Sequence, residues 1–361
     1  MRLPKSNKIT AEKYVVGLSQ FKNRAAKVKL SANESALGPS PKAVKEYLKL
    51  SKNFKRYPDS DGVNLRKALA KKFKLDPNKI ILGSGSDQIL ELICKAFLKK
   101  GDEVIVPKYS FLIYRLYSKI NGAKILYSSE KNFTVHVDGI LKKVTKKTKI
   151  VFLANPNNPT STYIDKKKLL FLRKRLRSNI LLVVDDAYFE YVKQKNYSSG
   201  LQLFSNFKNV VVTRTFSKIY GLAGLRVGWG HGSKEIINSL NQVKPPFNIN
   251  SPALSAAEAA IKDNPWLNKE IKHVKKWNDK FYKEFKKLNI ETNRSFTNFL
   301  LINFDKVKKN SSKIFRLLAD AGILVRKMNN YGIKNSLRVT IGKNDENKKL
   351  ILKLKKVINV W

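Results

Sequence analysis

The sixteen residues RTFSKIYGLAGLRVGW, Arg214 to Trp229, follow an apolar run, NVVV, and place one lysine among small and hydroxyl-bearing residues. That lysine, Lys218, comes after Thr215 and Ser217, and Arg226 stands eight residues later, past GLAG. Because 73 of the 361 residues are Lys or Arg, residue type alone carries no information here. Position does, since ligands of open α/β sheets bind beyond the carboxyl ends of the strands.

Short apolar runs alternate with helical patterns around this stretch, from about residue 65 to 235. The alternation predicts a mostly parallel α/β sheet, with a helix over 87–101 and strands within 79–85, 102–110, 148–160, 179–191 and 209–217. After residue 250 the pattern changes to a long helical stretch, 251–288, followed by a strand at 299–304, a helix at 313–322 and strands at 323–328 and 336–342. We therefore predict a large α/β domain over 30–250 and a smaller α+β domain made of 1–29 plus 251–361.

The composition combines a 42% apolar fraction, enough for a large core, with a formal net charge of +46. Such a charge suggests nucleic-acid binding, because clustered Lys and Arg neutralise phosphates. However, the lysines alternate with apolar residues at helical spacing, as in KAVKEYLKLSKNFK (42–55) and ENKKLILKLKKV (346–357), which is typical of solvated helix faces. We favour a compositional bias in lysine, with nucleic acid or an acidic partner as the alternative.

The chain has one cysteine, Cys94, and three histidines, at 136, 231 and 273. One cysteine excludes a disulfide framework, and the scattered histidines argue against a zinc site. We find no charged-then-apolar leader and no apolar run near the roughly 18 residues that a membrane helix needs. These features predict a cytoplasmic protein.

Polar residues also follow the other apolar runs. GSGSD (83–87) offers N–H groups at a helix N-terminus to a phosphate, although a plain turn with a Ser or Asp cap uses the same residues. VVDDAY (183–188) leads a strand into Asp185 and Asp186, where a carboxylate can hold a cationic ring nitrogen; a metal site or a helix cap is the alternative. NPNNPT (155–160) presents two asparagine amides at a third strand end, with Asn158-Pro159 a candidate cis bond, although a turn alone explains it.

Lys218 gives these strand ends a common chemistry. A lysine becomes a nucleophile when desolvation or a nearby cationic group removes its proton near neutral pH. Thr215, Ser217 and Arg226 beside it supply donors for a dianionic phosphate. The ordered set predicts that Lys218 forms an imine with a phosphate-bearing aldehyde whose ring nitrogen faces Asp185; that aldehyde is pyridoxal phosphate. Lys218 is then also the base that moves a proton at the substrate Cα.

On these residues the chain resembles the fold-type I pyridoxal-phosphate aminotransferases over essentially its whole length. The matching segments are LSANESALGPSPKAV (30–44), RYPDSDGVNLRKALA (56–70), GSGSDQILEL (83–92), NPNNPT, DDAYFEY, RTFSKIYGLAGLRVGW, PFNINSPALSAA (246–257) and SLRVTIG (336–342). Their order and spacing are specific to the superfamily. ANESALGPSP and RYPD narrow the resemblance to the histidinol-phosphate aminotransferases.

The resemblance implies how the cofactor is held. Lys218 matches the lysine that binds it, Asp185 the partner of its pyridine nitrogen, and Tyr188 and Asn158 the donors to its ring hydroxyl. Lys218, Asp185 and Tyr188 are the catalytic set. The phosphate cup matches Ser86, Asp87, Thr215, Ser217 and Arg226.

Two further tyrosines are matched in the same way. Tyr109, in PKYS, corresponds to the aromatic ring stacked on the cofactor. Tyr57, in RYPD, corresponds to a tyrosine that reaches the phosphate of the neighbouring subunit's cofactor, which implies a homodimer with shared sites. Two residues depart from the family pattern: Ser161 stands where Gly usually follows NPT, and Asp186 where Glu is frequent. Neither change removes a catalytic group, but Ser161 puts the local backbone conformation in question.

Substrate recognition is matched to two arginines, whose planar fork suits carboxylate and phosphate. Arg338 takes the anionic end of the substrate and Arg326 helps to hold a phosphate, unless Arg326 is a surface residue; Asn33 and Tyr14 are edge contacts. The implied reaction exchanges the amino group between L-histidinol phosphate and 2-oxoglutarate, giving imidazole-acetol phosphate and glutamate, in histidine biosynthesis. The alternatives are an aromatic aminotransferase, a phosphothreonine-type decarboxylase on this scaffold and, in a different class, a basic nucleic-acid-binding protein that keeps the scaffold.

Overall fold

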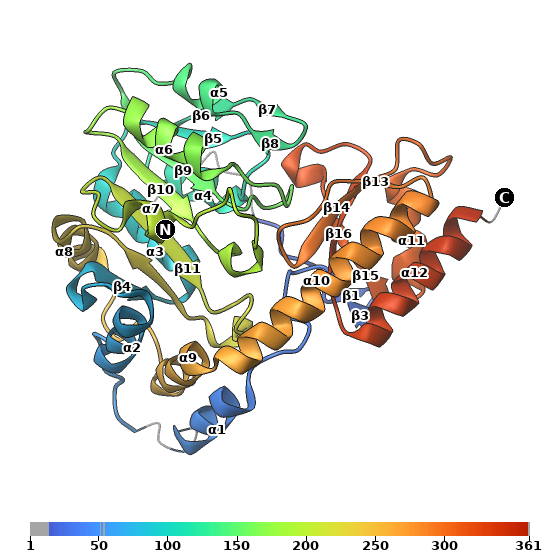
Figure 1. The fold of residues 1–361 in the computed structure, drawn as a ribbon, viewed down its shortest axis with the longest axis horizontal. Helices are drawn as coiled ribbons and strands as arrows, with labels where there is room; N and C mark the ends of the chain where they lie inside the picture. Colours follow the sequence, from blue (N-terminus) through green and yellow to red (C-terminus); the bar gives the residue numbers. More distant parts are fainter. Residues whose placement is uncertain (1–13, 51, 53–54, 360–361) are drawn as a thin grey trace, which may run out of the picture.

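The computed structural model describes residues 14–50, 52 and 55–359. Within this range a seven-stranded sheet has the order β4-β12-β11-β10-β9-β5-β6 (Figure 1). Its strands are β4 (Ile80–Gly83), β5 (Glu103–Pro107), β6 (Lys124–Ser128), β9 (Thr148–Ala154), β10 (Leu181–Asp185), β11 (Val210–Thr215) and β12 (Gly228–His231). Neighbouring strands are parallel except at β12, which runs antiparallel to both β11 and β4. The predicted mostly parallel sheet is confirmed, and β12 was not predicted.

Helices cover both faces of this sheet because its strands bury side chains on both faces. In β10, Leu182 and Val184 pack into one apolar cluster, and Leu181 and Val183 into another. The first cluster is completed by α1 (Pro41–Leu50), α2 (Val63–Phe73), α5 (Val137–Leu141), α6 (Lys166–Arg175), α7 (Gly200–Phe204) and α9 (Ser251–Lys262). The second is completed by α3 (Gly85–Phe97), α4 (Leu112–Ile120) and α8 (Lys234–Val243). Asp185, the last residue of β10, and Asp186, which follows it, therefore point to opposite faces.

The C-terminal part builds a second layer of its own. Among the described residues, four antiparallel strands have the order β13 (Glu291–Thr292), β14 (Phe299–Asn303), β17 (Ser336–Thr340) and β16 (Arg326–Lys327). They pack against α10 (Asn264–Lys287), α11 (Ser311–Asp320) and α12 (Asn344–Asn359) in a separate apolar cluster. On α10, Val274, Trp277, Phe281 and Phe285 recur at intervals of three and four and form its buried stripe.

Two predicted elements are each divided in the structure. The helical stretch 251–288 is two helices, because Asp263 ends α9 and caps α10, whose first turn contains Pro265. The strand predicted at 323–328 is two short strands: β15 (Ile323–Leu324) pairs with β3 (Val28–Lys29), whereas β16 joins the four-stranded sheet. The helix predicted at 87–101 begins two residues earlier and ends at Phe97. The remaining strands among the described residues are β1 (Gln20–Phe21), β2 (Arg24–Ala25), β7 (Glu130–Lys131) and β8 (Thr134–Val135).

The N-terminal segment crosses from one part to the other. β3 lies at the edge of the C-terminal part, and Ala36 and Leu37 donate their backbone N–H groups to the carboxylate of Glu270 on α10. Of the predicted small domain, 1–29 plus 251–361, residues 1–13, 360 and 361 lie outside the described range.

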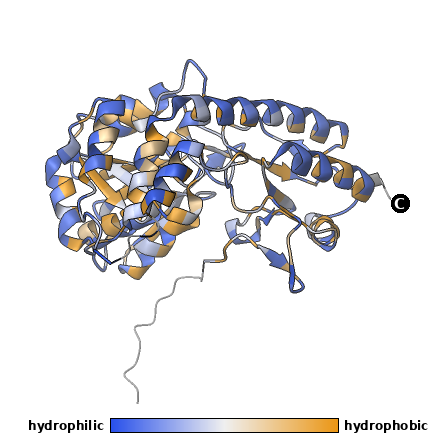
Figure 2. Cartoon of the chain, turned by 90° about the horizontal axis from the view of Figure 1, so that it is seen from below, coloured by the Kyte–Doolittle hydropathy of each residue, from blue (hydrophilic) through white to orange (hydrophobic). Residues whose placement is uncertain are grey.

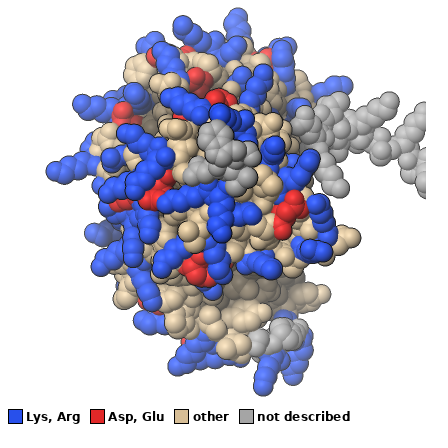
Figure 3. Space-filling view, turned by 90° about the vertical axis from the view of Figure 1, so that its right-hand side faces the viewer, with Lys and Arg blue, Asp and Glu red and all other residues tan. Residues whose placement is uncertain are grey.

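Hydrophobic residues concentrate where the helices meet the sheets, and hydrophilic residues line the outer helix faces (Figure 2). On the face drawn in Figure 3, Lys and Arg are spread over the whole surface with scattered Asp and Glu between them. Across the described range, no helix is long and apolar enough to span a membrane.

Candidate active site

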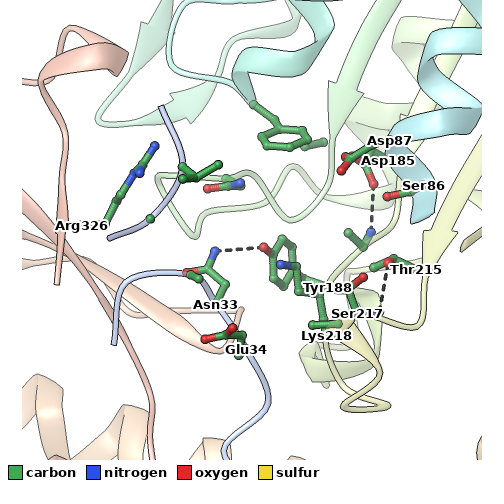
Figure 4. Close-up of a pocket in the computed structure, with 18 of the residues that line it drawn as sticks. Asn33, Glu34, Ser86, Asp87, Asp185, Tyr188, Thr215, Ser217, Lys218 and Arg326 are labelled. Carbon is green, nitrogen blue, oxygen red and sulfur yellow. Dashed lines mark hydrogen bonds between the residues drawn. The ribbon is translucent and has the colours of Figure 1, made fainter. Parts of the chain in front are cut away.

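A cavity of about 350 Å³ lies beyond the carboxyl ends of β9, β10 and β11, between the two parts of the chain (Figure 4). Its lining includes most of the predicted site residues: Tyr14, Asn33, Ser86, Asp87, Asn158, Asp185, Tyr188, Thr215, Ser217, Lys218, Arg226, Arg326 and Arg338. Residues that are up to 324 positions apart in the sequence, counting from Tyr14 to Arg338, thus meet in one place.

Lys218 projects into this cavity from the turn after β11 (Figure 4). Its Nζ lies 5.9 Å from the centre of the Tyr188 ring. Burial, together with the positive charge of Arg338, lowers the pKa of Lys218 to about 8. Near neutral pH this amine therefore loses its proton far more readily than an ordinary lysine does, as a nucleophile or base requires.

Asp185 faces the same cavity and is fixed by two donors. The Tyr114 hydroxyl donates to Oδ2 at 2.7 Å, and the backbone N–H of Ala187 donates to Oδ1 at 3.2 Å. Burial raises the pKa of Asp185 to about 6, against the opposing effect of the Tyr114 hydrogen bond. A cationic nitrogen beside it would favour the charged carboxylate, so the site fits a protonated ring nitrogen.

Hydroxyl, guanidinium and amide groups converge at the other end of the cavity. Arg226 donates to Ser217 Oγ at 3.1 Å and to Asp87 Oδ2 at 3.3 Å, and Ser217 N–H donates to Thr215 Oγ1 at 3.0 Å. Ser86 and Asp87 lie in the first turn of α3, so the helix N-terminus points at the same place. This donor set fits a phosphate.

Two glycines permit the close approach of these groups. A Cβ on Gly85, whose φ is +78°, would lie 2.3 Å from Arg226 Nη2. A Cβ on Gly228 would lie 2.2 Å from the backbone nitrogen of Ser86. Both positions therefore require glycine, because a side chain there would occupy the space in which the donors converge.

Tyr188 and Asn158 are each bonded to a residue of the N- or C-terminal segments. Asn33 Nδ2 donates to the Tyr188 hydroxyl at 3.0 Å, and Arg338 Nη1 donates to Asn158 Oδ1 at 2.6 Å. Burial raises the pKa of Tyr188 to about 12, so its hydroxyl stays protonated and can donate. Arg338 also donates to the Ser31 carbonyl at 3.2 Å, while its buried Nε has no partner within the described part of the chain.

Arg326 is buried, which argues against a surface role. Its guanidinium donates to the Val15 carbonyl, and Tyr14, one residue earlier, packs edge-on against Phe111 at 6.3 Å between ring centres. Tyr14, Val16 and Gly17 therefore line the cavity beside Arg326.

Comparison with known proteins agrees with this geometry. The family model for aminotransferase class I and II matches residues 25–354. The chain is 51% identical over 360 residues to the histidinol-phosphate aminotransferase of Pelagibacter ubique (strain HTCC1062), covering 99% of this chain and 100% of that protein. It is 42% identical to that of Rhodopseudomonas palustris (strain BisA53), covering 95% and 94%. The chain belongs to the histidinol-phosphate aminotransferases.

A solved structure shows the family fold directly. The crystal structure of histidinol-phosphate aminotransferase from Sinorhizobium meliloti in complex with pyridoxal-5'-phosphate matches with a TM-score of 0.86, covering 93% of this chain and 92% of that one, at 24% identity. The predicted fold-type I architecture, a mostly parallel α/β sheet with a smaller α+β part, is thereby confirmed.

Two residues predicted for the aminotransferase site do not line this chain's cavity. The Tyr109 ring packs against Phe133 at 5.7 Å between centres, and Phe111 and Tyr114, further along, line the cavity instead. The backbone N–H of Tyr109 donates to Glu130 at 2.8 Å, which holds this residue at the β7 side. Tyr57 is 82% exposed and stacks on Phe247 at 4.5 Å.

The two departures from the family pattern have clear structural settings. Ser161 is buried with φ +59°, a conformation that glycine adopts without strain, and its Oγ has no partner among the described residues. Asp186 lies on the face opposite Asp185, where it accepts from Gly200 N–H at 2.8 Å and pairs with Arg214 at 3.5 Å. In the neighbouring NPNNPT loop, both Asn-Pro bonds are cis.

Tyr114, Glu34 and Lys29 line the cavity without having been predicted. Tyr114 lies in a helix with no polar motif around it, so its hydroxyl could not be assigned to Asp185 from the sequence. Glu34 follows Asn33 in LSANESALGPSPKAV, a segment that matches the family. The sequence could therefore have placed Glu34 at the site.

Proposed function

We infer that this chain is a pyridoxal-phosphate-dependent transaminase that exchanges the amino group between L-histidinol phosphate and 2-oxoglutarate in histidine biosynthesis. The observation that carries this inference is the meeting of three groups in one cavity: an amine with a lowered pKa, a buried carboxylate and a converging set of phosphate donors. Family membership supports the substrate class.

The residues present fit the cofactor. Asp185 would hold the proton on its ring nitrogen, and Tyr188 and Asn158 would face its ring hydroxyl. Its phosphate would be held by Ser86, Asp87, Thr215, Ser217 and Arg226. When bound, the cofactor supplies an aldehyde that combines with amines and a ring that accepts electrons.

The protein's own contribution is to place and move protons. Lys218 supplies the neutral amine that holds the cofactor and then transfers a proton at the substrate Cα. Asp185 remains charged opposite the ring nitrogen because Tyr114 and Ala187 N–H stabilise its carboxylate. Arg226 and the N-terminus of α3 offset the charge of the phosphate.

The substrate would bind on the side of the cavity that the N- and C-terminal segments form. Arg338 would take the anionic group that both substrates carry beside the reacting carbon, and Arg326 would assist with the larger phosphate. Arg338 is already positioned by Asn158 and Ser31, so its fork is ordered before the substrate arrives.

We propose a homodimer in which Tyr57 reaches the partner's cofactor phosphate. The support is that the Tyr57 ring is exposed and lies outside this chain's own cavity. We also propose a domain division at 30–250 and 1–29 plus 251–361. The apolar cluster around α10, α11 and α12 is separate from the two clusters of the large sheet, which supports two parts, although α9 (Ser251–Lys262) packs with the large sheet. A cytoplasmic location is proposed from the single free, buried cysteine, Cys94.

The experiment that tests this function is a visible absorbance spectrum of the purified protein and of Lys218→Ala, before and after histidinol phosphate is added. We expect a cofactor band in the wild type that is lost or shifted in the variant and that changes when this amine is added. No band after addition of pyridoxal phosphate would overturn the cofactor assignment. A band that responds only to phenylalanine or tyrosine would move the substrate to the aromatic amino acids.

A further inference from the structure

An ion pair forms part of the cavity wall away from the cofactor residues. Lys29 Nζ lies 2.8 Å from Glu34 Oε1, and both residues line the cavity. Their side chains are 35% and 43% exposed, respectively. The other carboxylates in the lining, Asp87 and Asp185, already have partners at the phosphate and ring-nitrogen positions. Glu34 is thus the lining carboxylate with no part in holding the cofactor.

The pair stands apart from Arg326, which would assist in holding the substrate phosphate. Figure 4 shows Arg326 and Glu34 on different sides of Asn33. Glu34 is also close enough to Lys218 for its negative charge to act on that amine. A substrate held by the arginines, with its reacting carbon at Lys218, carries one further substituent on that carbon. This substituent would lie near Lys29 and Glu34, which present a positive and a negative charge to it.

The two substrates differ at that substituent. Histidinol phosphate and glutamate both carry an anionic group beside the amine-bearing carbon, which the arginines can hold in common. Their remaining substituents have opposite requirements: an imidazole presents N–H donors and is readily protonated, whereas the side-chain carboxylate of glutamate or 2-oxoglutarate needs donors. One rigid wall of a single charge would favour one substrate and repel the other.

We propose that the Lys29–Glu34 pair is the element that lets one site accept both substrates. Glu34 accepts a hydrogen bond from the imidazole N–H of histidinol phosphate, and Lys29 binds the side-chain carboxylate of 2-oxoglutarate or glutamate. Between these events the two side chains neutralise each other. This inference rests on the proposed function, because it assumes that both substrates use this cavity.

Separating Lys29 from Glu34 costs little free energy. A half-exposed ion pair contributes little to stability, so either side chain can leave its partner at small cost. The backbone beneath Glu34 is fixed, however: Asn298 Nδ2 donates to the Asn33 carbonyl at 3.0 Å and to the Glu34 carbonyl at 3.1 Å. Lys29 is held by its place in β3, paired with Leu324. Movement is confined to the two side chains.

The test measures the two half-reactions separately on the holoenzyme, by following cofactor absorbance after mixing with histidinol phosphate or, for the reverse direction, glutamate. For Glu34→Gln we expect kcat/KM for histidinol phosphate to fall about 10- to 100-fold, mainly through KM, because a charge-assisted hydrogen bond is lost. The glutamate half-reaction should change less than about threefold. Lys29→Gln should show the opposite pattern.

Matched controls come from the Lys22–Asp320 pair, which has the same 2.8 Å separation but does not line the cavity. Lys22→Gln and Asp320→Asn remove the same charges and should leave both half-reactions unchanged. Phenylalaninol phosphate, which lacks the ring N–H, should react equally with the wild type and Glu34→Gln.

The outcomes separate the two inferences. If the wild type does not react with histidinol phosphate, the proposed function itself fails. If the wild type reacts but each variant affects both half-reactions alike, or neither, the role of the Lys29–Glu34 pair is overturned. Selective loss of one half-reaction in each variant supports it.

Discussion

The two ends of the cavity are built in different ways. At the cofactor end, groups from the strand ends and helices of the large α/β part are already hydrogen-bonded to each other, as Asp185 is to Tyr114 and Arg226 to Ser217. At the substrate end, the groups come from opposite ends of the chain, and the Lys29–Glu34 pair is half-exposed. A cofactor that stays bound favours a pre-ordered site, whereas two substrates that alternate favour one whose side chains can change partners.

The largest expected effect comes from a change at the cofactor end, the removal of Lys218, because both half-reactions depend on that end. We expect Lys218→Ala to lower both half-reaction rates by at least about 10³-fold, because the proton-transfer base is lost whichever substrate is present. Stopped-flow absorbance with excess cofactor measures this. Lys275→Ala, an exposed lysine paired with Asp279 on α10, is the control and should be unaffected. A variant that keeps a tenth of the wild-type rate would remove Lys218 from the mechanism.

The second prediction compares Asp185, at the end of β10, with its neighbour Asp186. Asp185→Asn keeps an oxygen for the Tyr114 hydroxyl but removes the charge opposite the ring nitrogen, so kcat should fall about 100-fold in both half-reactions. Asp186→Asn removes the carboxylate that pairs with the buried Arg214 and should instead lower the free energy of unfolding by about 3 kcal/mol.

Steady-state kinetics and urea unfolding of both variants distinguish these effects. If Asp186→Asn loses activity as severely as Asp185→Asn at full cofactor occupancy, the assignment of one carboxylate to chemistry and the other to folding is wrong.

The rate of cofactor uptake should vary with pH as the fraction of neutral Lys218 does. Its pKa is about 8 rather than the ordinary 10.5, and only the neutral amine attacks an aldehyde. The rate at which cofactor-free protein takes up pyridoxal phosphate should therefore fall about tenfold for each pH unit below 8 and level off above it. The rate of appearance of the visible band measures this. A plateau reached only above pH 10 would mean that burial does not lower the pKa.

The smallest expected effect is at Ser161, whose carbonyl accepts from Phe296 N–H at 3.1 Å, a bond between the α/β part and the C-terminal part of the chain. Ser161→Gly should raise the free energy of unfolding by about 0.5–1 kcal/mol, since glycine adopts the positive φ without steric cost. Ser161→Ala, which removes the unpartnered hydroxyl but keeps Cβ, should gain less. Thermal unfolding compares them, and an equal gain in both would assign the effect to the hydroxyl.

The sequence predicted the cofactor end more completely than the substrate end, for a physical reason. Strand ends of a parallel sheet meet at one edge, so the residues after each apolar run could be placed together without knowing the tertiary structure. No such rule places the chain termini. The pairing of β3 with β15, the bond from Arg326 to Val15 and the position of Glu34 all depend on contacts between distant segments.

Local ambiguity accounts for the other differences. β12 contains two glycines and begins inside the motif around Lys218, so no apolar alternation marked it as a strand. PKYSFLIY holds three aromatic rings within six residues, and the turn into α4 decides which of them face the cavity. Spacing alone could not choose Phe111 and Tyr114 over Tyr109.

The hydrogen bond from Asn33 N–H to Thr340 Oγ1 joins residues 307 positions apart. At translation rates of 5–20 residues per second, the ribosome needs roughly 15 to 60 s to make the second residue after the first. During that interval the early segment has been synthesised but its partners have not. The cofactor-binding strands can assemble while the chain is still growing, whereas the wall that carries Asn33 and Glu34 must wait for the last residues to emerge. The enzyme thus acquires its substrate-binding wall only at the very end of its own synthesis.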